Sequence, residues 1–194
     1  TLFHVIMGLL KPSSGTIEIF GEVRKKEKDF VPIRHRIGLL FQDADDQLFS
    51  PTVIEDVAFG PLNLGKSKQE ALDISRKTLD YLGLIGFEDR ITFKLSGGEK
   101  RLVSLATILA MQPEVLLLDE PTNALDTSMK SRLINILQGL DLSYILISHE
   151  FDVLSKTAHA FYSMEGGKIF RDDREHIHTH QHAHKIGRQP HKHV

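Results

Sequence analysis

The sequence of 194 residues contains no cysteine and no tryptophan. Without cysteine, neither a disulfide framework nor a zinc site with thiolate ligands can form. No apolar stretch approaches the roughly 20 residues that a helix needs to cross a bilayer, so we expect any membrane role to pass through a partner protein. A secretory leader with a basic start and an apolar core is also missing. A reducing, cytoplasmic environment fits these absences.

The sequence also has no excess of positive charge. The net charge of −2 argues against a general nucleic-acid-binding protein. The hydrophobic share of 41% and the charged share of 26% are ordinary for a globular domain. The length suits one domain with a sizeable core. Histidine is the residue type in excess, since seven of the 11 histidines fall within residues 176–194.

Two motifs lie close together in the second half of the chain. Residues 95–99, Leu-Ser-Gly-Gly-Glu, predict a turn that opens a helix and leaves backbone N–H groups free to hold an anion. Residues 115–120 are an apolar run that ends in Asp119 and Glu120. Such a run predicts a buried parallel strand that delivers two carboxylates to a metal–phosphate site. Each motif alone is also found in solvated loops and strand ends, so their order along the chain carries the prediction.

Hydrophobic periodicity predicts alternating helices and strands. Residues 43–65 mix loop and helix, residues 24–29 predict a charged surface loop, and Ser67 is expected to cap the helix that follows. We expect helices over residues 1–11, 67–82, 97–111, 129–140 and 151–156, strands over residues 16–20, 36–41, 115–119 and 144–148, and a hairpin over residues 160–164 and 168–171.

These motifs, followed by Pro121-Thr122 and by residues 123–126 (Asn-Ala-Leu-Asp), resemble the ATP-binding cassette (ABC) ATPases, the motor subunits of membrane transporters. The resemblance covers about residues 1–171. It implies an α/β fold of the P-loop NTPase type, with a parallel sheet, a helical subdomain over about residues 43–110 and a small antiparallel arm. Residues 172–194 are expected to form a disordered, histidine-rich tail.

The resemblance assigns a role to each polar residue at a predicted strand end. Asp119 would hold Mg²⁺ between the β- and γ-phosphates of ATP, and Glu120 would orient and polarise the attacking water. His149, after the next strand, would contact the γ-phosphate. Gln42, after an earlier strand, would touch the Mg²⁺ ion or the water. Taken alone, His149 suits a structural histidine and Gln42 an exposed glutamine, so the family order decides for the functional roles.

The remaining predicted nucleotide-binding residues act between two protomers. In the resemblance, Ser96, Gly97, Gly98 and Glu99 reach across a head-to-tail dimer of two ATPase protomers to the γ-phosphate held by the partner. Glu99 replaces the more frequent glutamine of the family pattern. Asp126 would link the two sites of the dimer.

A finer match lies in residues 41–49 and 55–65. These residues resemble the ATPases of energy-coupling-factor importers, in particular the cobalt and nickel branch. The match implies that the protein powers import of a transition metal ion, nickel or cobalt, together with integral-membrane subunits. It also implies a peripheral position at the cytoplasmic face of the cell membrane.

The C-terminal histidines form a second group of candidate ligands. Imidazole suits Ni²⁺ and Co²⁺, and residues two apart in an extended chain can chelate an ion. A solvated tail and a purification tag are the alternatives, and the interspersed Ile, Thr, Gln and Ala residues disfavour the tag. The candidate ligands are His176, His178, His180, His182, His184, His191 and His193.

The family's glycine-rich phosphate loop, Gly-x-x-Gly-x-Gly-Lys-[Ser/Thr], is not among the 194 residues. Thr1 and Leu2 match the residues that follow this loop, which would make Thr1 a nucleotide-binding residue. We therefore expect an N-terminally truncated chain without the phosphate-loop strand and without ATPase activity of its own. The alternative is a catalytically inactive interaction or metal-storage module. A cassette ATPase of DNA repair would need coiled-coil arms and a basic face, and the sequence has neither.

Overall fold

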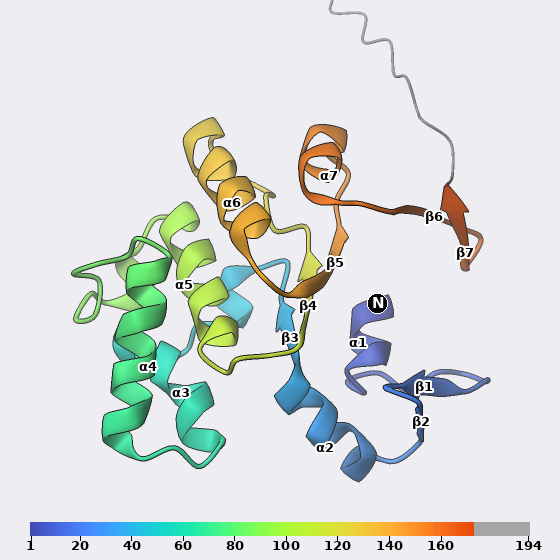
Figure 1. Cartoon of the computed structure of the whole chain (residues 1–194), viewed down its shortest axis with the longest axis horizontal. Coiled ribbons are helices and arrows are strands. Elements are labelled where there is room, and N and C mark those ends of the chain that lie inside the picture. Colours follow the sequence, from blue (N-terminus) through green and yellow to red (C-terminus); the bar gives the residue numbers. More distant parts are fainter. Residues whose placement is uncertain (173–194) are drawn as a thin grey trace, which may run out of the picture. The chain divides into compact units, whose positions relative to one another are not determined.

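A computed structural model describes residues 1–172. The contacts divide the chain into two compact units, residues 1–157 and residues 158–194. Helices and strands alternate along the first unit (Figure 1). Its elements are α1 (Leu2–Ile6), β1 (Ile17–Ile19), β2 (Glu22–Arg24), α2 (Glu27–Arg36), β3 (Ile37–Leu40), η1 (Ala44–Asp46), α3 (Val53–Asn63), α4 (Lys68–Tyr81), η2 (Thr92–Lys94), α5 (Gly97–Leu109), β4 (Val115–Asp119), α6 (Thr127–Gly139), β5 (Ser143–Ile147) and α7 (Phe151–Thr157).

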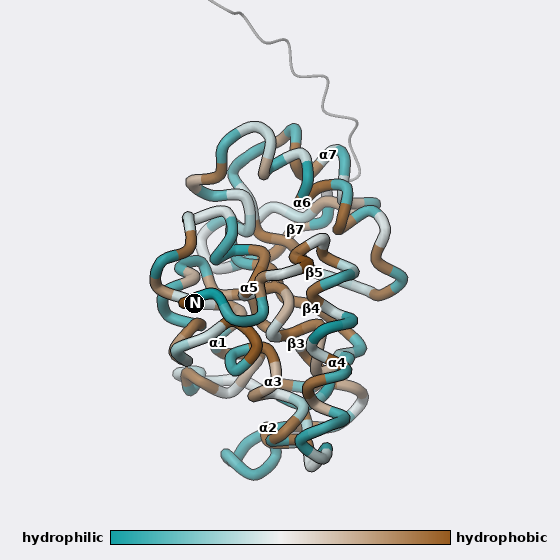
Figure 2. The backbone as a smooth tube through the Cα atoms, turned by 90° about the vertical axis from the view of Figure 1, so that its left-hand side faces the viewer, coloured by the Kyte–Doolittle hydropathy of each residue, from teal (hydrophilic) through white to brown (hydrophobic). Residues whose placement is uncertain are grey.

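A parallel sheet of order β3-β4-β5 forms the centre of the first unit. The apolar runs of β3 and β4 are buried, as expected for parallel strands covered on both faces. The tube coloured by hydropathy shows hydrophobic residues gathered along these strands (Figure 2). β5 differs from the buried strand expected over residues 144–148, because Ile145 is exposed and β4 is its only partner within residues 1–172. An edge strand has a neighbour on one side only, so its side chains stay half-exposed.

Helices cover both faces of the sheet. On one face, α5 and α3 pack with Leu116 and Leu118 of β4. On the other face, α1 and α2 supply Phe3 and Ile33, which pack with Leu117. Neighbouring residues of a strand point to opposite faces, so β4 serves both clusters. Figure 1 shows α5 and α1 on opposite sides of β3 and β4.

Two segments of the helical region, residues 51–54 and 88–92, are held together by backbone hydrogen bonds. The buried carboxylate of Asp56 fastens the same region. One of its oxygens accepts the N–H groups of Phe49 and Ser50, and the other accepts the Thr92 hydroxyl at 3.2 Å. These bonds connect the loop before α3 to the segment before α5.

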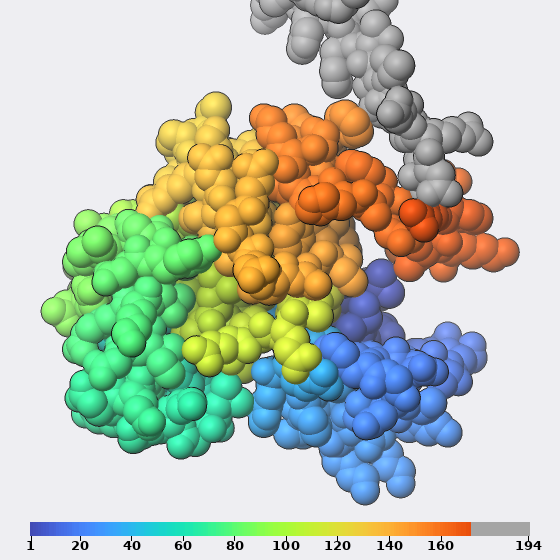
Figure 3. Space-filling view, in the orientation of Figure 1, coloured from blue at the N-terminus to red at the C-terminus, as the bar shows by residue number. Residues whose placement is uncertain are grey.

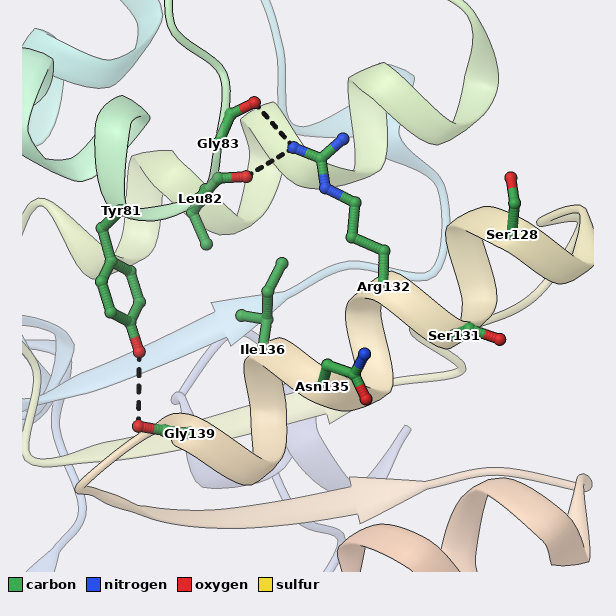
Figure 4. A pocket seen from close by; sticks show the side chains of 9 residues that line it. All are labelled: Tyr81, Leu82, Gly83, Ser128, Ser131, Arg132, Asn135, Ile136 and Gly139. Carbon is green, nitrogen blue, oxygen red and sulfur yellow. Dashed lines mark hydrogen bonds between the residues drawn. The ribbon is translucent and has the colours of Figure 1, made fainter.

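A side-chain joint connects the end of α4 to α6. Nη2 of Arg132 donates to the carbonyl oxygens of Leu82 at 2.6 Å and Gly83 at 2.8 Å, which lie beyond the last turn of α4 (Figure 4). Tyr81 donates its hydroxyl to the carbonyl of Gly139. In the space-filling view α6, in gold, lies against the green helices (Figure 3). The positive side chain also suits the negative end of the α4 dipole.

Several expected elements are confirmed. The strand over residues 115–119 has the predicted bounds, and Ser67 caps α4 by accepting the N–H of Glu70. The α/β class with a parallel sheet and small antiparallel pairs is confirmed by β3-β4-β5 and by the pair β1–β2. In the second unit, the predicted hairpin is present as β6 (Phe161–Glu165) and β7 (Lys168–Asp172). Across residues 1–172, none of the helices combines the length and the apolar character that a membrane span requires.

Two expected elements are wrong. The helix expected over residues 1–11 ends at Ile6, because Gly8 takes a left-handed conformation with φ of 68°. A Cβ atom at Gly8 would lie 2.3 Å from the Phe30 ring, so the close packing of α2 requires glycine there. The charged loop expected over residues 24–29 is replaced from Glu27 by α2, which buries Phe30 and Ile33 among its charged residues.

Replacing Arg132 by methionine tests the joint between α4 and α6. The Arg132→Met variant loses both hydrogen bonds to carbonyl oxygens, and we expect the free energy of unfolding to fall by about 1–2 kcal/mol. Urea denaturation measures the change. Arg76→Met is the matched control, because the exposed pair Arg76–Asp73 should contribute less than about 0.5 kcal/mol. Equal effects of the two substitutions would contradict the stabilising role of the joint.

Candidate functional site

The carboxyl ends of β4 and β5 bring Glu120 and His149 together. In the parallel register Asp119 lies opposite Ile147, and the N–H of Glu120 donates to the carbonyl of Ile147 at 3.0 Å. The chain then places Nε2 of His149 3.3 Å from Oε1 of Glu120. Two residues predicted from separate motifs therefore form one cluster.

The environments of these two side chains differ. The Glu120 side chain is 13% exposed, and the His149 side chain is 94% exposed. Glu120 has φ of 45°, a conformation unusual for a residue other than glycine, and this turns the chain sharply out of β4. Its buried Oε1 has no hydrogen-bond partner among residues 1–172. A buried carboxylate oxygen that lies 3.3 Å from an exposed imidazole and accepts no hydrogen bond from the described residues is suited to accept a proton from a small polar molecule.

Asp119 ends β4 directly before this cluster and is half-buried. Its carboxylate is a hard oxygen ligand of the kind that Mg²⁺ prefers. Within residues 1–172, no group of three or more His, Asp and Glu side chains could hold a metal ion. Proteins usually hold Mg²⁺ through one or two carboxylates together with phosphate oxygens of a substrate.

A second acid, Glu150, fixes the two loops that carry Glu120 and His149. The buried Thr122 hydroxyl donates to Glu150 at 2.8 Å, and the Lys130 ammonium group of α6 donates to its other oxygen. The Lys130 ammonium and then the Thr122 hydroxyl hold the pKa of Glu150 below its usual value. Sequence reasoning missed Glu150, although its place directly after His149 was a usable signal.

Asp126 stands at the start of α6, where it caps the helix. Its carboxylate accepts the N–H groups of Ser128 at 2.8 Å and Met129 at 3.0 Å. The Ser128 hydroxyl, followed by the Met129 N–H group, keeps the pKa of Asp126 below its usual value. The carboxylate is therefore ionised and held at the end of the loop that begins with Glu120.

Gln42 lies exposed at the end of β3, on a loop fastened to α5. The buried guanidinium of Arg101 donates to the carbonyl oxygens of Phe41 and Gln42. Gln47 donates from its amide nitrogen to the Ser104 carbonyl at 2.8 Å. These contacts fix the backbone and leave the Gln42 side chain at the surface. The sequence held no local signal for Arg101, because its partners lie about 60 residues away.

The serine–glycine turn (residues 95–99) opens α5, as the sequence predicts. The Ser96 hydroxyl oxygen accepts the N–H of Glu99, and the Glu99 carboxylate accepts the N–H of Ser96. Gly97 is exposed. A Cβ atom at Gly98 would lie 2.9 Å from Met129, so glycine lets the turn approach the start of α6. Across the described part of the chain, no hydrogen bond or ion pair joins this turn to Glu120 or His149.

The other predicted site residues are Thr1 and the histidines near the C-terminus. Thr1 is exposed and precedes α1, whose side chains pack on the sheet, and its own side chain makes no capping hydrogen bond. The seven predicted histidine ligands at residues 176–193 lie outside the described residues. A groove of about 590 Å³ lies between the end of α4 and α6, lined in part by Arg132 and Asn135 (Figure 4). It contains none of the predicted site residues.

Comparison with known proteins identifies the family of the chain. The profile of the ABC transporter family matches residues 1–123. An ABC transporter ATP-binding protein of Nitratidesulfovibrio vulgaris is 49% identical over 193 residues, which cover 100% of this chain and 70% of that protein. The energy-coupling factor transporter ATP-binding protein EcfA of Methanocaldococcus jannaschii is 43% identical over 176 residues, covering 89% of this chain and 63% of that protein.

A solved structure gives the same result for the fold. The structure of cbiO1 from Clostridium perfringens, described as part of the ABC transporter complex cbiONQ, superposes with a TM-score of 0.77 at 34% sequence identity. The match covers 87% of this chain and 69% of that chain. The chain therefore belongs to the family of ATP-binding subunits of ABC transporters.

Proposed function

We propose that the protein hydrolyses ATP to power import of a transition metal ion, nickel or cobalt, through an energy-coupling-factor type of transporter. The observation that carries the ATPase part is the pairing of Glu120 with His149, whose Oε1 and Nε2 atoms lie 3.3 Å apart at adjacent strand ends. The relative named energy-coupling factor transporter ATP-binding protein EcfA supports the transporter type. The finer match of residues 41–49 and 55–65 supports the cobalt and nickel branch.

The chemistry follows from the two environments at the strand ends. The exposed imidazole of His149 would donate a hydrogen bond to the γ-phosphate of ATP. Oε1 of Glu120, which accepts no hydrogen bond from the described residues, would accept one from the attacking water and draw its proton away. As the water oxygen bonds to the γ-phosphorus, the bond to the β,γ-bridging oxygen would break and ADP would leave. Because Glu120 is held in a turn after β4, little reorganisation is needed when the water binds.

Asp119, with the amide oxygen of Gln42, would hold Mg²⁺. When bound, the ion would neutralise charge on the β- and γ-phosphates. Both donors are hard oxygen ligands, and both follow parallel strands of one sheet. The placement of Asp119 directly before Glu120 would set the water beside the phosphate that the ion orients.

The serine–glycine turn would act on the nucleotide of a second protomer in a head-to-tail dimer. Ser96 and Gly97 are exposed, and the first N–H groups of α5 have no partner within that helix. Gly98 lies against Met129, so Asp126 would sit at the same protomer interface.

An exposed aromatic patch (Phe49, Phe59 and Phe93) would dock on the integral-membrane subunits, at the cytoplasmic face of the membrane. Phe49 is 66% exposed and Phe93 is 72% exposed. The rings of Phe49 and Phe59 meet edge to face at 4.8 Å. Exposed aromatic side chains are typical of protein interfaces. Asp56 bonds to the N–H of Phe49 and to Thr92, which precedes Phe93, and so fastens the patch to the segment before α5.

Replacing Glu120 by glutamine tests the ATPase mechanism. We expect Glu120→Gln to lower kcat for ATP about 10²–10⁴-fold, because the amide cannot take the proton. ATP binding should persist, since the phosphate contacts remain. Steady-state hydrolysis and nucleotide titration measure the two effects. Glu165→Gln, at an exposed residue of β6, is the control, and an unchanged kcat for Glu120→Gln would refute the proposed role.

Replacing the exposed phenylalanines tests the docking surface. We expect the double substitution Phe49→Ser and Phe93→Ser to weaken binding to the membrane subunits at least about tenfold, because buried aromatic anchors dominate interface energies. Copurification with the membrane subunits in detergent measures the loss. Tyr162→Ser removes an aromatic ring of similar exposure from β6 and serves as control. Full retention of the membrane subunits by the double variant would show that this surface is not the docking site.

Titration with metal ions tests the histidine ligands. We propose that the seven histidines of residues 176–193 bind Ni²⁺ or Co²⁺ as a buffer or sensor. Calorimetric titration of each ion into the protein, with and without residues 174–194, should show binding that disappears with the histidines. Mg²⁺ is the control ion, because it prefers oxygen ligands. Equal binding of Ni²⁺ and Co²⁺ by both forms would exclude these residues as the ligands.

A further inference from the structure

A negative charge lies inside the serine–glycine turn that would receive a phosphate. Glu99 occupies the third position of α5, and its carboxylate is 29% exposed. Its Oε2 accepts the N–H of Ser96 at 2.8 Å and the Ser96 hydroxyl at 2.9 Å. Those two bonds leave Oε1 as the oxygen that could repel an incoming phosphate.

Arg90 covers this oxygen. Nη1 of Arg90 lies 2.8 Å from Oε1 of Glu99 and donates a hydrogen bond to it. The Ser96 backbone, the Ser96 hydroxyl and the Arg90 guanidinium together hold the pKa of Glu99 below its usual value. Glu99 is therefore ionised near neutral pH, and its charge is matched by one guanidinium.

The guanidinium is held in place from its other side. It stacks on the ring of Phe87, with Cζ 3.8 Å from the ring centroid. The Arg90 backbone is fixed as well, because its N–H donates to the carbonyl of Phe87 and its own carbonyl accepts the N–H of Val53. Arg90 thus sits at the junction of the paired segments 51–54 and 88–92 and reaches across to α5.

This ion pair is expected to contribute little to the stability of the fold. The Arg90 side chain is 49% exposed, and exposed pairs contribute little to the free energy of unfolding. Beside a bound phosphate the same charges interact more strongly, because the phosphate carries several negative charges and a closed interface excludes water. Removing Arg90 would leave an uncompensated carboxylate beside the phosphate, and glutamine at residue 99 would remove the repulsion.

We propose that Arg90 is a positioning residue of the nucleotide interface, which neutralises Glu99 so that the serine–glycine turn accepts the γ-phosphate held by a second protomer. This inference rests on the proposed function. It adds that the turn works as a unit of Arg90, Ser96 and Glu99, in which the arginine is needed because residue 99 is glutamate.

A charge-rescue experiment tests this role. In the full-length protein carrying Glu120→Gln, ATP-dependent dimerisation is followed by analytical ultracentrifugation against ATP concentration. We expect Arg90→Gln to raise the ATP concentration at half-maximal dimer about tenfold. Because glutamine at residue 99 removes the negative charge, the Arg90→Gln/Glu99→Gln double variant should recover to within about threefold of the parent. Arg76→Gln is the control for loss of an exposed arginine of the helical region.

The outcomes separate this role from a structural one. An equal loss in Arg90→Gln and in the double variant would overturn the inference, because a purely structural role of Arg90 does not depend on the charge of residue 99. Unchanged dimerisation in Arg90→Gln would also overturn it while the proposed function stands. If the parent forms no ATP-dependent dimer, both the role of Arg90 and the proposed function are overturned.

If Arg90→Gln lowers the melting temperature of the protein, Arg90→Lys is used in its place. Lysine keeps the charge and loses the planar stack on Phe87. Half-maximal dimerisation within about threefold of the parent supports the charge role. A tenfold loss in Arg90→Lys would overturn it.

Discussion

The parallel pairing of β4 with β5 is the constraint on which the candidate site depends. It sets Asp119 opposite Ile147 and bonds the Glu120 backbone to the Ile147 carbonyl. A shift of this register by one residue would turn the side chains of β5 to opposite faces and move His149 away from Glu120. The packing of β5 fixes the register, because Tyr144 and Leu146 join the cluster of Leu116 and Leu118, and Ile147 joins that of Leu117.

The serine–glycine turn depends on contacts in the helical region. The buried Asp56 joins the loop at Phe49 to Thr92, the segment containing Thr92 carries Arg90, and Arg90 bonds to Glu99 at the start of α5. A continuous series of hydrogen bonds and short backbone segments thus connects the exposed aromatic patch to the proposed phosphate-binding turn. The same turn reaches α6 through Gly98, so residues of α5 and α6 meet beside it.

The sequence was sufficient where the signal is local. The apolar run of β4 and the capping serine of α4 follow from neighbouring residues, and both are present with the predicted bounds or role. The sequence did not predict α2, because its two buried residues, Phe30 and Ile33, stand among many charged residues. Nor did it predict the end of α1 at Gly8, which depends on packing against α2. The pairing of Glu120 with His149 was predicted, but Arg90, Arg101 and Glu150 were missed because their partners are set by tertiary contacts or by charge compensation.

The most direct test of the account is a crystal structure of the full-length Glu120→Gln protein with ATP and Mg²⁺. We expect a γ-phosphate within hydrogen-bond distance of His149 in one protomer and of the Ser96–Gly98 backbone in the other, with a water beside residue 120. A nucleotide bound away from the ends of β4 and β5, or a γ-phosphate that contacts neither His149 nor the serine–glycine turn, would contradict it.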